Sequence, residues 1–461
     1  MLLKAPEIAS VEKRKFEKRL FYMSQISRFG MSSEEVIAWV VDARERALEL
    51  VADLDDEQIM GLLFPTTNPL LWEIGHHAWF QSFWVLRYVA GQTPVREDED
   101  ALYDSIAIEH DIRWDLPLPS RGETLKYLRT VQDRVIALLR AEPSDELLYH
   151  ALYAILHEDM HTEAITYTRQ TLGYVAPALS IAPKAERRPL GGGPLAGDAQ
   201  IPGGTFMLGA DRDEPFVFDN EKWAHPVEIE PFAIGRAAVT QAEFLRFVEE
   251  DGYGRREFWQ EEGWQWRTEA QAIHPVYWRR VDSGWQRRHF DTWNALEEYL
   301  PAIHVNWHEA QAYCAWAGRR LPSEAEWQVA ASAEPTADGK GLSGRRRRFP
   351  WGDAAPSPER ANLDWQAMSC VDVGALPAGD SPFGCRQMVG NLWEWTDDTF
   401  LPFADFVVDP YKDYSEPWFG TRKVMLGGCW ATRSRLIRNN YRNFQTPDRR
   451  DAWVGFRTCA R

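Results

Sequence analysis

Two histidines four residues apart, His157 and His161, are the residues of this chain whose type and spacing most clearly permit metal chemistry. Side chains separated by four residues lie on the same face of an α-helix, one above the other. The residues before the pair, 152–156, contain no proline or glycine and are compatible with a helix. Because imidazole nitrogens bind transition metals, the pair predicts two ligands of a metal site.

A third histidine, His76, lies in another stretch of helical pattern and could complete the site from a facing helix. Three histidines on an octahedral ion leave up to three positions open, as in the facial triads of non-haem iron oxygenases, with a histidine in place of the carboxylate. Open positions let one ion hold O2 and a substrate atom together, which a closed four-ligand site could not do. The neighbouring His77 would point about 100° away and is expected to be only a helix neighbour.

The segment from His157 to His161 also matches the pattern H-E-x-x-H, in which the glutamate of a zinc hydrolase acts as the general base. Glu158 would then be that base. The pattern is short and is often matched by chance. No further ligand follows it after a glycine turn at the usual distance, although Glu163 lies nearby. A zinc hydrolase is therefore kept as an alternative to an oxygenase.

The elements that must position these histidines are long helices in the first part of the chain. Apolar residues recur at helical spacing over residues 33–54, 68–90, 120–141 and 144–172, and the first stretch begins with the capping signal Ser33-Glu34-Glu35. Four such helices predict an antiparallel bundle. Residues 182–204 then change to proline, glycine and charge, which is typical of a linker. The predicted organisation is a helical domain at 1–180, a linker at 181–197 and a second domain at 198–461.

The second domain has a different pattern. Short β-like pieces at 205–208, 227–229 and 232–234 precede two helices, which begin at Thr240 and Ser323 with capping boxes. Long loops rich in tryptophan, glycine and proline connect them, and most of the 22 tryptophans follow Trp223. Large flat side chains of this kind fill irregular gaps. We expect an α+β domain with much irregular structure.

The bulk composition excludes several classes of protein. The net charge of -17 argues against a nucleic-acid partner, and no run of about 18 apolar residues could span a membrane. The N-terminal residues lack the apolar stretch of a secretory signal, and the five cysteines show no CxxC spacing, which favours reduced thiols. We expect a cytoplasmic protein in which the basic run Arg345–Arg348 is a solvated loop.

Several motifs together resemble known families. The second half contains I-P-G-G-T-F-M-L-G (201–209), G-R-R-L-P-S-E-A-E-W (318–327), G-N-L-W-E-W-T (390–396), G-G-C-W (427–430) and G-F-R (455–457). These resemble the formylglycine-generating-enzyme-like (sulfatase-modifying factor) fold, a variant of the C-type lectin fold, over residues 198–461. The first half, with W-E-I-G-H (72–76) and H-x3-H-x-E (157–163), resembles the DinB-like four-helix bundle of the ergothioneine-pathway sulfoxide synthases, EgtB and OvoA.

The resemblance implies that His76, His157 and His161 bind Fe(II) where the second domain closes over the bundle. Members of that family use Fe(II) and O2 to join a chalcogen to C2 of the imidazole ring of hercynine (Nα-trimethylhistidine). Asn443 matches a family asparagine that contacts the hercynine carboxylate. Some relatives of the fold hold structural calcium, so a calcium site is a further possibility. The implied partners are small-molecule substrates, and the oligomeric state is left open.

Several positions depart from the ergothioneine pattern. Phe403 stands where we expect a family tyrosine that assists the oxygen chemistry, and it offers no hydroxyl. Ala107 and His110 stand where arginines would clamp the carboxylates of γ-glutamylcysteine. The family's Asn-Trp-Asp becomes Asn443-Phe444-Gln445, which removes an anion that could pair with an amine. The pocket predicted from these segments contains Phe403, Phe406, Asn443, Phe444, Gln445 and Arg449.

The loss of both charged anchors favours a donor that is not an amino-acid zwitterion. This pattern resembles the selenoneine synthase branch (SenA), which takes selenium from the selenosugar 1-seleno-β-D-glucose. Three alternatives remain open: an ergothioneine-type sulfoxide synthase that uses cysteine or γ-glutamylcysteine, a zinc hydrolase, and a binding module whose lectin-like domain recognises a ligand while the bundle serves as a scaffold.

Overall fold

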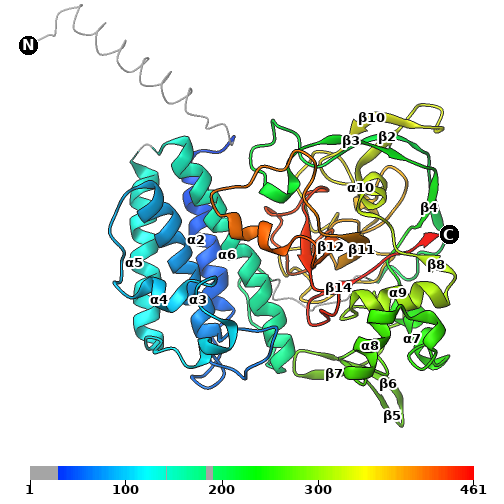
Figure 1. Ribbon diagram of the computed structural model, residues 1–461, viewed down its shortest axis with the longest axis horizontal. Helices are drawn as coiled ribbons and strands as arrows, with labels where there is room; N and C mark the ends of the chain where they lie inside the picture. The colour runs from blue at the N-terminus through cyan, green and yellow to red at the C-terminus, as the bar shows by residue number, and fades with distance from the viewer. Residues whose placement is uncertain (1–29, 142, 183–190) are drawn as a thin grey trace, which may run out of the picture.

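The computed structural model describes residues 30–141, 143–182 and 191–461. The helices of the first half are α2 (Ser33–Glu49), α3 (Leu70–Gln81), which continues as the π-helix η1 (Ser82–Val89), α4 (Glu99–Tyr103), the 3-10 helix η2 (His110–Trp114), α5 (Arg121–Arg140) and α6 (Asp145–Leu172). The four long helices predicted from periodicity are confirmed, and they pack side by side as a bundle (Figure 1).

The first helix begins with a capping box one residue earlier than expected. The side chain of Ser32, not Ser33, accepts a hydrogen bond from the backbone of Glu35, whose carboxylate bonds back to Ser32. A capping box requires the acid three positions after the cap, and Glu35 stands in that position relative to Ser32 and not to Ser33. Helix α6 ends at Gly173, whose φ of 70° lies in the left-handed region that favours glycine.

The second half combines short strands, short helices and long loops. Its strands are β1 (Asp198–Ile201), β2 (Gly204–Leu208), β3 (His225–Ile229), β4 (Phe232–Gly235), β5 (Trp278–Val281), β6 (Gly284–His289), β7 (Thr292–Ala295), β8 (Arg319–Arg320), β9 (Ala333–Pro335), β10 (Leu342–Arg346), β11 (Trp393–Thr399), β12 (Lys423–Leu426), β13 (Asn443–Gln445), β14 (Val454–Gly455) and β15 (Cys459–Ala460). Its α-helices are α7 (Gln241–Glu249), α8 (Glu261–Glu269), α9 (Trp307–Trp316) and α10 (Glu324–Ser332). Its 3-10 helices are η3 (Asp219–Glu221), η4 (Arg256–Phe258), η5 (Pro377–Gly379), η6 (Lys412–Tyr414) and η7 (Glu416–Trp418).

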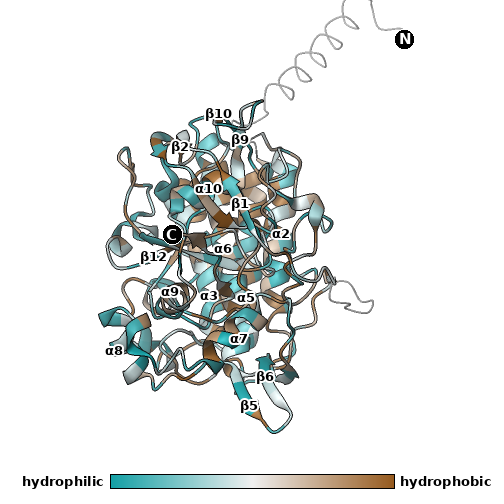
Figure 2. Ribbon diagram, turned by 90° about the vertical axis from the view of Figure 1, so that its right-hand side faces the viewer, coloured by the Kyte–Doolittle hydropathy of each residue, from teal (hydrophilic) through white to brown (hydrophobic). Residues whose placement is uncertain are grey.

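Two four-stranded sheets form the centre of this half, in the orders β1-β4-β15-β8 and β13-β12-β11-β14. Three smaller sheets pair β2 with β3, β9 with β10, and β5, β6 and β7 with one another. The predicted helices at Thr240 and Ser323 both begin with capping boxes, as expected. Helix α8 and the β5–β6 hairpin, largely teal in Figure 2, lie at an edge of the molecule.

Tryptophans fill much of the interior of the second half. Trp327, Trp365, Trp393, Trp395, Trp430 and Trp453 are among its largest fully buried side chains. Trp327 Nε1 donates a 2.7 Å hydrogen bond to Glu394, which also forms a buried ion pair with Arg457. The expectation that flat side chains fill the gaps of an irregular fold is confirmed.

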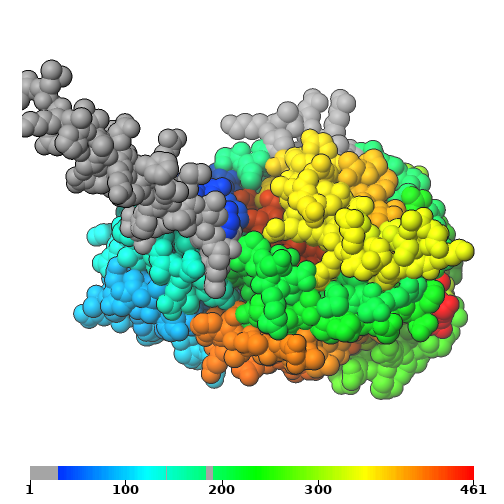
Figure 3. Space-filling view, turned by 90° about the horizontal axis from the view of Figure 1, so that it is seen from above, coloured from blue at the N-terminus to red at the C-terminus, as the bar shows by residue number. Residues whose placement is uncertain are grey.

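Helix α6 lies between the rest of the bundle and the second half of the chain (Figure 1). The two halves are in contact along one side of the bundle, as the space-filling view shows (Figure 3). The residues on which the expectation of no secretory signal rests, and part of the predicted linker, lie outside the described residues. All five cysteines are buried and unpaired, and no helix of the described ranges is long and apolar enough to cross a membrane.

Candidate metal centre

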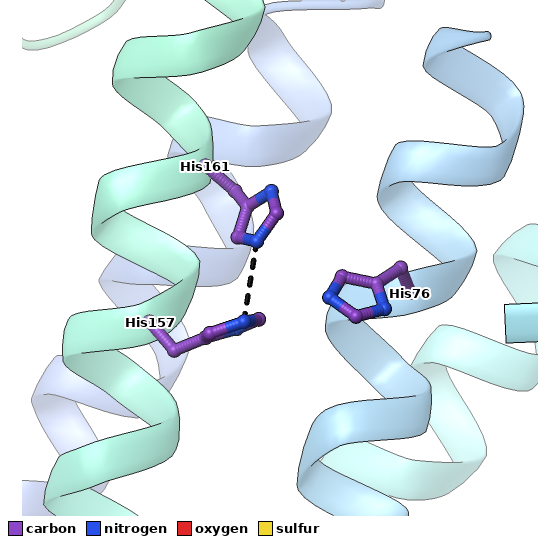
Figure 4. A group of neighbouring side chains, drawn as sticks. All are labelled: His76, His157 and His161. Carbon is purple, nitrogen blue, oxygen red and sulfur yellow. Dashed lines mark hydrogen bonds between the residues drawn. The ribbon is translucent and has the colours of Figure 1, made fainter. Parts of the chain in front are cut away.

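Three histidines from two facing helices converge in the bundle (Figure 4). His157 and His161 project from α6 and His76 projects from α3, and one nitrogen of each lies within 4.8 Å of the others. His76 and His157 are buried, and His161 is half-buried. The three residues predicted as metal ligands are thus brought together.

Hydrogen bonds orient two of the three rings. His76 Nδ1 donates to the carbonyl oxygen of Tyr103 at 2.8 Å, and His161 Nδ1 donates to Glu73 at 2.7 Å. Each bond leaves Nε2 as the ligand atom. Tyr103 can approach α3 closely because residue 75 is glycine, where a Cβ would lie 2.2 Å from the Tyr103 ring. The glycine of the W-E-I-G-H motif therefore has a role in orienting His76.

The spacing of the nitrogens suits a metal ion. His161 Nε2 and His157 Nε2 are 3.2 Å apart. Two metal–imidazole bonds of about 2.1 Å at a right angle would hold the nitrogens about 3.0 Å apart. Two unprotonated nitrogens would repel each other at this distance without a cation between them. The donor set, three imidazole nitrogens that converge from two helices, fits an iron centre with open positions.

Burial keeps the ligands in the form that binds metal. It lowers the pKa of His76 and of His157 well below the usual value, and the neighbouring His161 lowers both further. Burial opposes ionisation of Glu73, yet the adjacent His161 holds the pKa of this carboxyl at about 2. Two of the three imidazoles are thus kept neutral by burial, and a carboxylate lies behind the third, a common arrangement around metal-bound histidine.

Aromatic rings pack against the histidines and fix their planes. The His76 ring lies between Trp72 and Trp79, with centroids 4.9 and 5.4 Å away. His157 stacks on Phe80 with centroids 3.7 Å apart. Rings held on both sides cannot rotate freely, so the ligand atoms are positioned before a metal binds.

Glu158 does not face the three histidines, although it lies between two of them in sequence. Its carboxylate is fully buried and receives hydrogen bonds from Arg44 at 2.7 and 3.2 Å and from Gln81 at 2.9 Å. Despite burial, Arg44 and His77 hold its pKa at about 2. A carboxylate committed to a buried ion pair cannot serve as the general base of a zinc hydrolase.

The structure places Phe403 away from the histidines. Its ring contacts His225 and the Arg442 guanidinium, with centroid distances of 4.8 and 4.2 Å, within the hydrophobic cluster of the second half. The ring nearest the metal site from this part of the chain is instead Tyr411, 6.2 Å from His157. Tyr414, from η6, donates a hydrogen bond to the sulfur of Met160 on α6.

Sequence reasoning missed these two tyrosines. The signal that could have found them is the pair Tyr411-x-x-Tyr414, because two aromatic residues three apart lie on one side of a helical turn. The loop between Thr399 and Lys423 has no regular strand or long helix, so a motif match there could not show which residue reaches the bundle.

The remaining residues of the predicted pocket make contacts in different parts of the second half. Phe444 stacks on Phe400 and is 6.1 Å from Tyr414, whereas Phe406 packs against Phe419. Asn443 accepts a hydrogen bond from the backbone of Phe444. β13, which carries Asn443 to Gln445, thus approaches the bundle through the Tyr414 ring.

Arg449 lies at the boundary of the two halves. Its guanidinium pairs with Asp451, donates to the carbonyl oxygen of Thr66 at 3.1 Å and lies over the Tyr167 ring of α6. A weak 3.4 Å contact joins it to Gln445. The predicted substrate residue is therefore already engaged in holding the halves together.

The segment expected to carry donor anchors has no free cation between residues 104 and 113. Ala107 is exposed, and His110 is bonded to Asp111 and to the carbonyl oxygen of Thr67. Arg113 is buried over the Trp72 ring, and its guanidinium donates to Asn68 at 2.7 Å and to two backbone carbonyls. Both of its terminal nitrogens are thus engaged by neutral groups of the protein, whereas its buried Nε has no hydrogen-bond partner in the described ranges.

Comparisons with known proteins match both halves. Residues 186–461 match the family described as sulfatase-modifying factor enzyme 1-like domain, and residues 40–168 match the DinB superfamily. These matches confirm the resemblances drawn from the sequence motifs. Three curated relatives, each called hercynine oxygenase, align with nearly the whole chain. The one from Mycolicibacterium thermoresistibile is 35% identical over 92% of this chain and 94% of its own. Those from Mycolicibacterium smegmatis and Mycobacterium tuberculosis are 36% and 35% identical over 90% and 92% of this chain, and 96% and 98% of their own.

Proposed function

This chain belongs to the hercynine oxygenase family and is an O2-dependent oxidoreductase, and we propose that it is a selenoneine synthase. It would form a carbon–selenium bond between C2 of the hercynine imidazole and the selenosugar 1-seleno-β-D-glucose. The observation that carries the choice of donor is the segment 104–113, which offers no free guanidinium for a donor carboxylate.

The cofactor of this proposal is Fe(II), held by His76, His157 and His161 through the nitrogens that converge in Figure 4. Bound there, Fe(II) supplies the one-electron chemistry that O2 activation requires. The hydrogen bonds that His76 and His161 donate to the Tyr103 carbonyl and to Glu73 hold these rings in one tautomer, and Trp72 and Phe80 pack against the His76 and His157 rings.

Tyr411 is the residue we propose as the proton donor to the reacting atoms. It reaches the metal site from the second half of the chain, and burial raises the pKa of its phenol, so the hydroxyl keeps its proton at neutral pH. This assignment takes the place of the tyrosine that the sequence comparison found missing at Phe403.

A neutral donor suits the side chains that segments 104–113 and 411–414 place near the three histidines. A carboxylate-bearing peptide gains affinity from a bidentate arginine, and Arg113 is not free to form one. A sugar is held instead by hydroxyl hydrogen bonds and aromatic faces, which Tyr411, Tyr414 and Phe444 can provide.

The second candidate is a sulfoxide synthase that uses cysteine or γ-glutamylcysteine, and the names of the curated relatives favour hercynine as the acceptor in either case. To separate them, Fe(II)-loaded protein and hercynine are mixed anaerobically with each donor, O2 is added, and products are identified by mass spectrometry. The proposal expects a selenium-containing product with the selenosugar. Turnover only with a thiol amino acid would refute it.

A gain-of-function variant tests the structural argument directly. Placing arginines at both positions, Ala107→Arg with His110→Arg, should raise the use of γ-glutamylcysteine relative to the selenosugar. Ala107→Arg alone is compared with Ala270→Arg, which adds the same single charge at an exposed site at the end of α8. Unchanged donor preference in the double variant would show that this segment does not select the donor.

A further inference from the structure

Three redox-active side chains form a line from the metal site to the protein surface. The ring of Tyr411 is 6.2 Å from that of His157, Trp84 is 5.8 Å from Tyr411, and Tyr88 is 5.1 Å from Trp84. Trp84 is half-buried, and Tyr88 is 54% exposed. Trp84 and Tyr88 lie on the π-helix η1, which continues directly from the helix that carries His76.

The types of these residues matter as much as their spacing. Phenol and indole are the side chains that lose a single electron most readily, and rings in contact exchange electrons easily. A line of leucines or phenylalanines would fill the same space without this property. Phe80, stacked on His157 and 6.2 Å from Trp84, adds a parallel contact but is not itself readily oxidised.

The outer end of the line is open to solvent. Tyr88 is 54% exposed, so its phenol proton can pass directly to water when the ring loses an electron. His150 packs beside Tyr88 and Trp84, with ring centroids 5.2 and 5.9 Å away, and no hydrogen bond joins its Nε2 to either ring.

We propose that Tyr411, Trp84 and Tyr88 form a relay that carries oxidising equivalents away from the metal site when O2 is reduced without a chalcogen donor. The relay rests on the O2-dependent function proposed above. Tyr411 gives up an electron together with its phenol proton, and the O2-derived oxygen takes up both. Trp84 returns an electron to Tyr411, which regains a proton from solvent.

The remaining steps return Trp84 and Tyr88 to their starting states, so that electrons and protons balance. Tyr88 returns an electron to Trp84, and the exposed phenol of Tyr88 releases its proton to solvent. A small-molecule reductant such as ascorbate then transfers a hydrogen atom to Tyr88. In total, one hydrogen atom of the reductant reaches the oxygen, and every side chain returns to its starting state. Exposure of Tyr88 is what allows the reductant to reach it.

The benefit of such a relay is protection of the site. Met160, which accepts the Tyr414 hydrogen bond, lies next to His161 in sequence. An oxidant that the relay does not reduce would oxidise this side chain to the sulfoxide. The amount of Met160 sulfoxide therefore measures oxidative damage near the metal site.

The test uses the Fe(II)-loaded full chain with hercynine, O2 and ascorbate but no donor. Tyr88→Phe removes the last redox-active ring while keeping its shape, and Tyr299→Phe, at a 39% exposed tyrosine off the line, is the matched control. Turnovers before inactivation are counted from O2 uptake, and peptide mass spectrometry measures Met160 sulfoxide. Tyr88→Phe should inactivate several-fold sooner with more sulfoxide, and Tyr299→Phe should match the parent.

Initial product formation with the donor present separates this proposal from the proposed function. The relay predicts that Tyr88→Phe keeps the parent's initial rate, because the residue is far from the chemistry. Equal inactivation and equal sulfoxide in Tyr88→Phe and the parent would overturn the relay while leaving the function intact. Absence of O2 uptake in every protein, the parent included, would overturn the function and the relay with it.

Discussion

Among single residues, Glu73 determines which nitrogen of His161 faces the other two histidines. Its carboxylate fixes the tautomer of His161 and is itself held by Asn68 at 2.9 Å. We expect Glu73→Ala to weaken metal binding by about 10- to 100-fold, as for other carboxylates behind metal-bound histidines. Titration with Co(II), followed by its visible absorption, measures the affinity. Asn68→Ala, which leaves the His161 contact intact, should have a smaller effect, and equal affinities for all three proteins would contradict the assignment.

Glu158 distinguishes a hydrolase from an oxygenase at the level of one side chain. Because it pairs with buried Arg44, Glu158→Ala should destabilise the fold by about 3–5 kcal/mol, the usual cost of leaving one member of a buried pair unmatched. Glu158→Gln keeps two acceptor or donor groups in place and should cost less. Urea unfolding gives the stability, and activity per folded molecule should be unchanged in Glu158→Gln. Loss of activity at full stability would restore a catalytic role for this residue.

These residues also show what sequence could and could not predict. The four-residue spacing placed His157 and His161 on one helical face, and the motif around His76 supplied the third candidate ligand. The same spacing could not show that Glu158 turns to Arg44, because that depends on how α2 packs against α6. Contacts between distant segments are not contained in a local pattern.

Among the elements, α6 has the largest role in the structure of the site, because other parts of the protein pack against almost every face of it. One face carries the histidines toward α3, and another carries Asp159, Glu163, Thr166 and Gln170 toward the second half of the chain. Asp159, between the two ligand histidines, forms a bidentate pair with Arg435 at 2.6 and 2.8 Å. The rotation of α6 about its axis is therefore set partly by the other half of the molecule.

This coupling predicts that Arg435→Met weakens metal binding although it touches no ligand. Removing the pair leaves Asp159 buried without its partner and lets α6 rotate, which separates the histidine nitrogens from His76. Co(II) affinity should fall several-fold. Arg386→Met removes a comparable bidentate pair with Asp380, far from α6, and serves as the control. The coupling is refuted if both variants lose stability but keep the parent's affinity.

The far end of α6 is tied to the segment after α2 by an ion pair that responds to acid. Hydrogen bonds from buried Arg169 hold the pKa of Asp53 below its usual value despite partial burial. A lowered carboxyl pKa gives stability that is full above the unfolded-state value, about 3.9, and is lost as the pH falls further. Asp53→Asn should therefore unfold more easily than the parent at pH 7, with a difference that shrinks toward pH 3. Parallel stability curves from pH 7 to pH 3 would contradict this.

The presence of the long helices and several of their N-terminal ends were the most predictable features of the fold, since periodic stretches and capping boxes carry a direct local signal. The end of the first helix was not, because the stretch expected to be helical over residues 33–54 leaves the helix after Glu49. The loop from Phe400 to Arg422 was not predictable in this way, because its course depends on contacts with the bundle. The motif match accordingly placed Phe403 at the metal site, whereas its ring packs against His225 and the ring of Tyr411 lies 6.2 Å from His157.

At the scale of the whole molecule, the metal site belongs to both halves. The candidate ligands come from the bundle, but Tyr411 packs near His157 and Tyr414 bonds to Met160 from the second half. Trp393 and Thr432 also donate hydrogen bonds to Glu163, two residues beyond His161. A sequence divided into two domains predicts two independent bodies. The shared face of α6 makes them one cooperative unit around the site.

Because both halves contribute residues to the site, metal binding should slow hydrogen exchange in both. A metal present at 100 times its dissociation constant stabilises the bound state by about 2.7 kcal/mol. Because the residues over the site come from the other half, hydrogen exchange should slow on metal binding in α3 and α6 and also in segment 411–418. His157→Ala, which removes one ligand, should show neither effect, and the β5–β6 hairpin should exchange equally with and without metal as an internal reference. Protection confined to α3 and α6 would show that the bundle binds metal independently and that the second half only adjoins it.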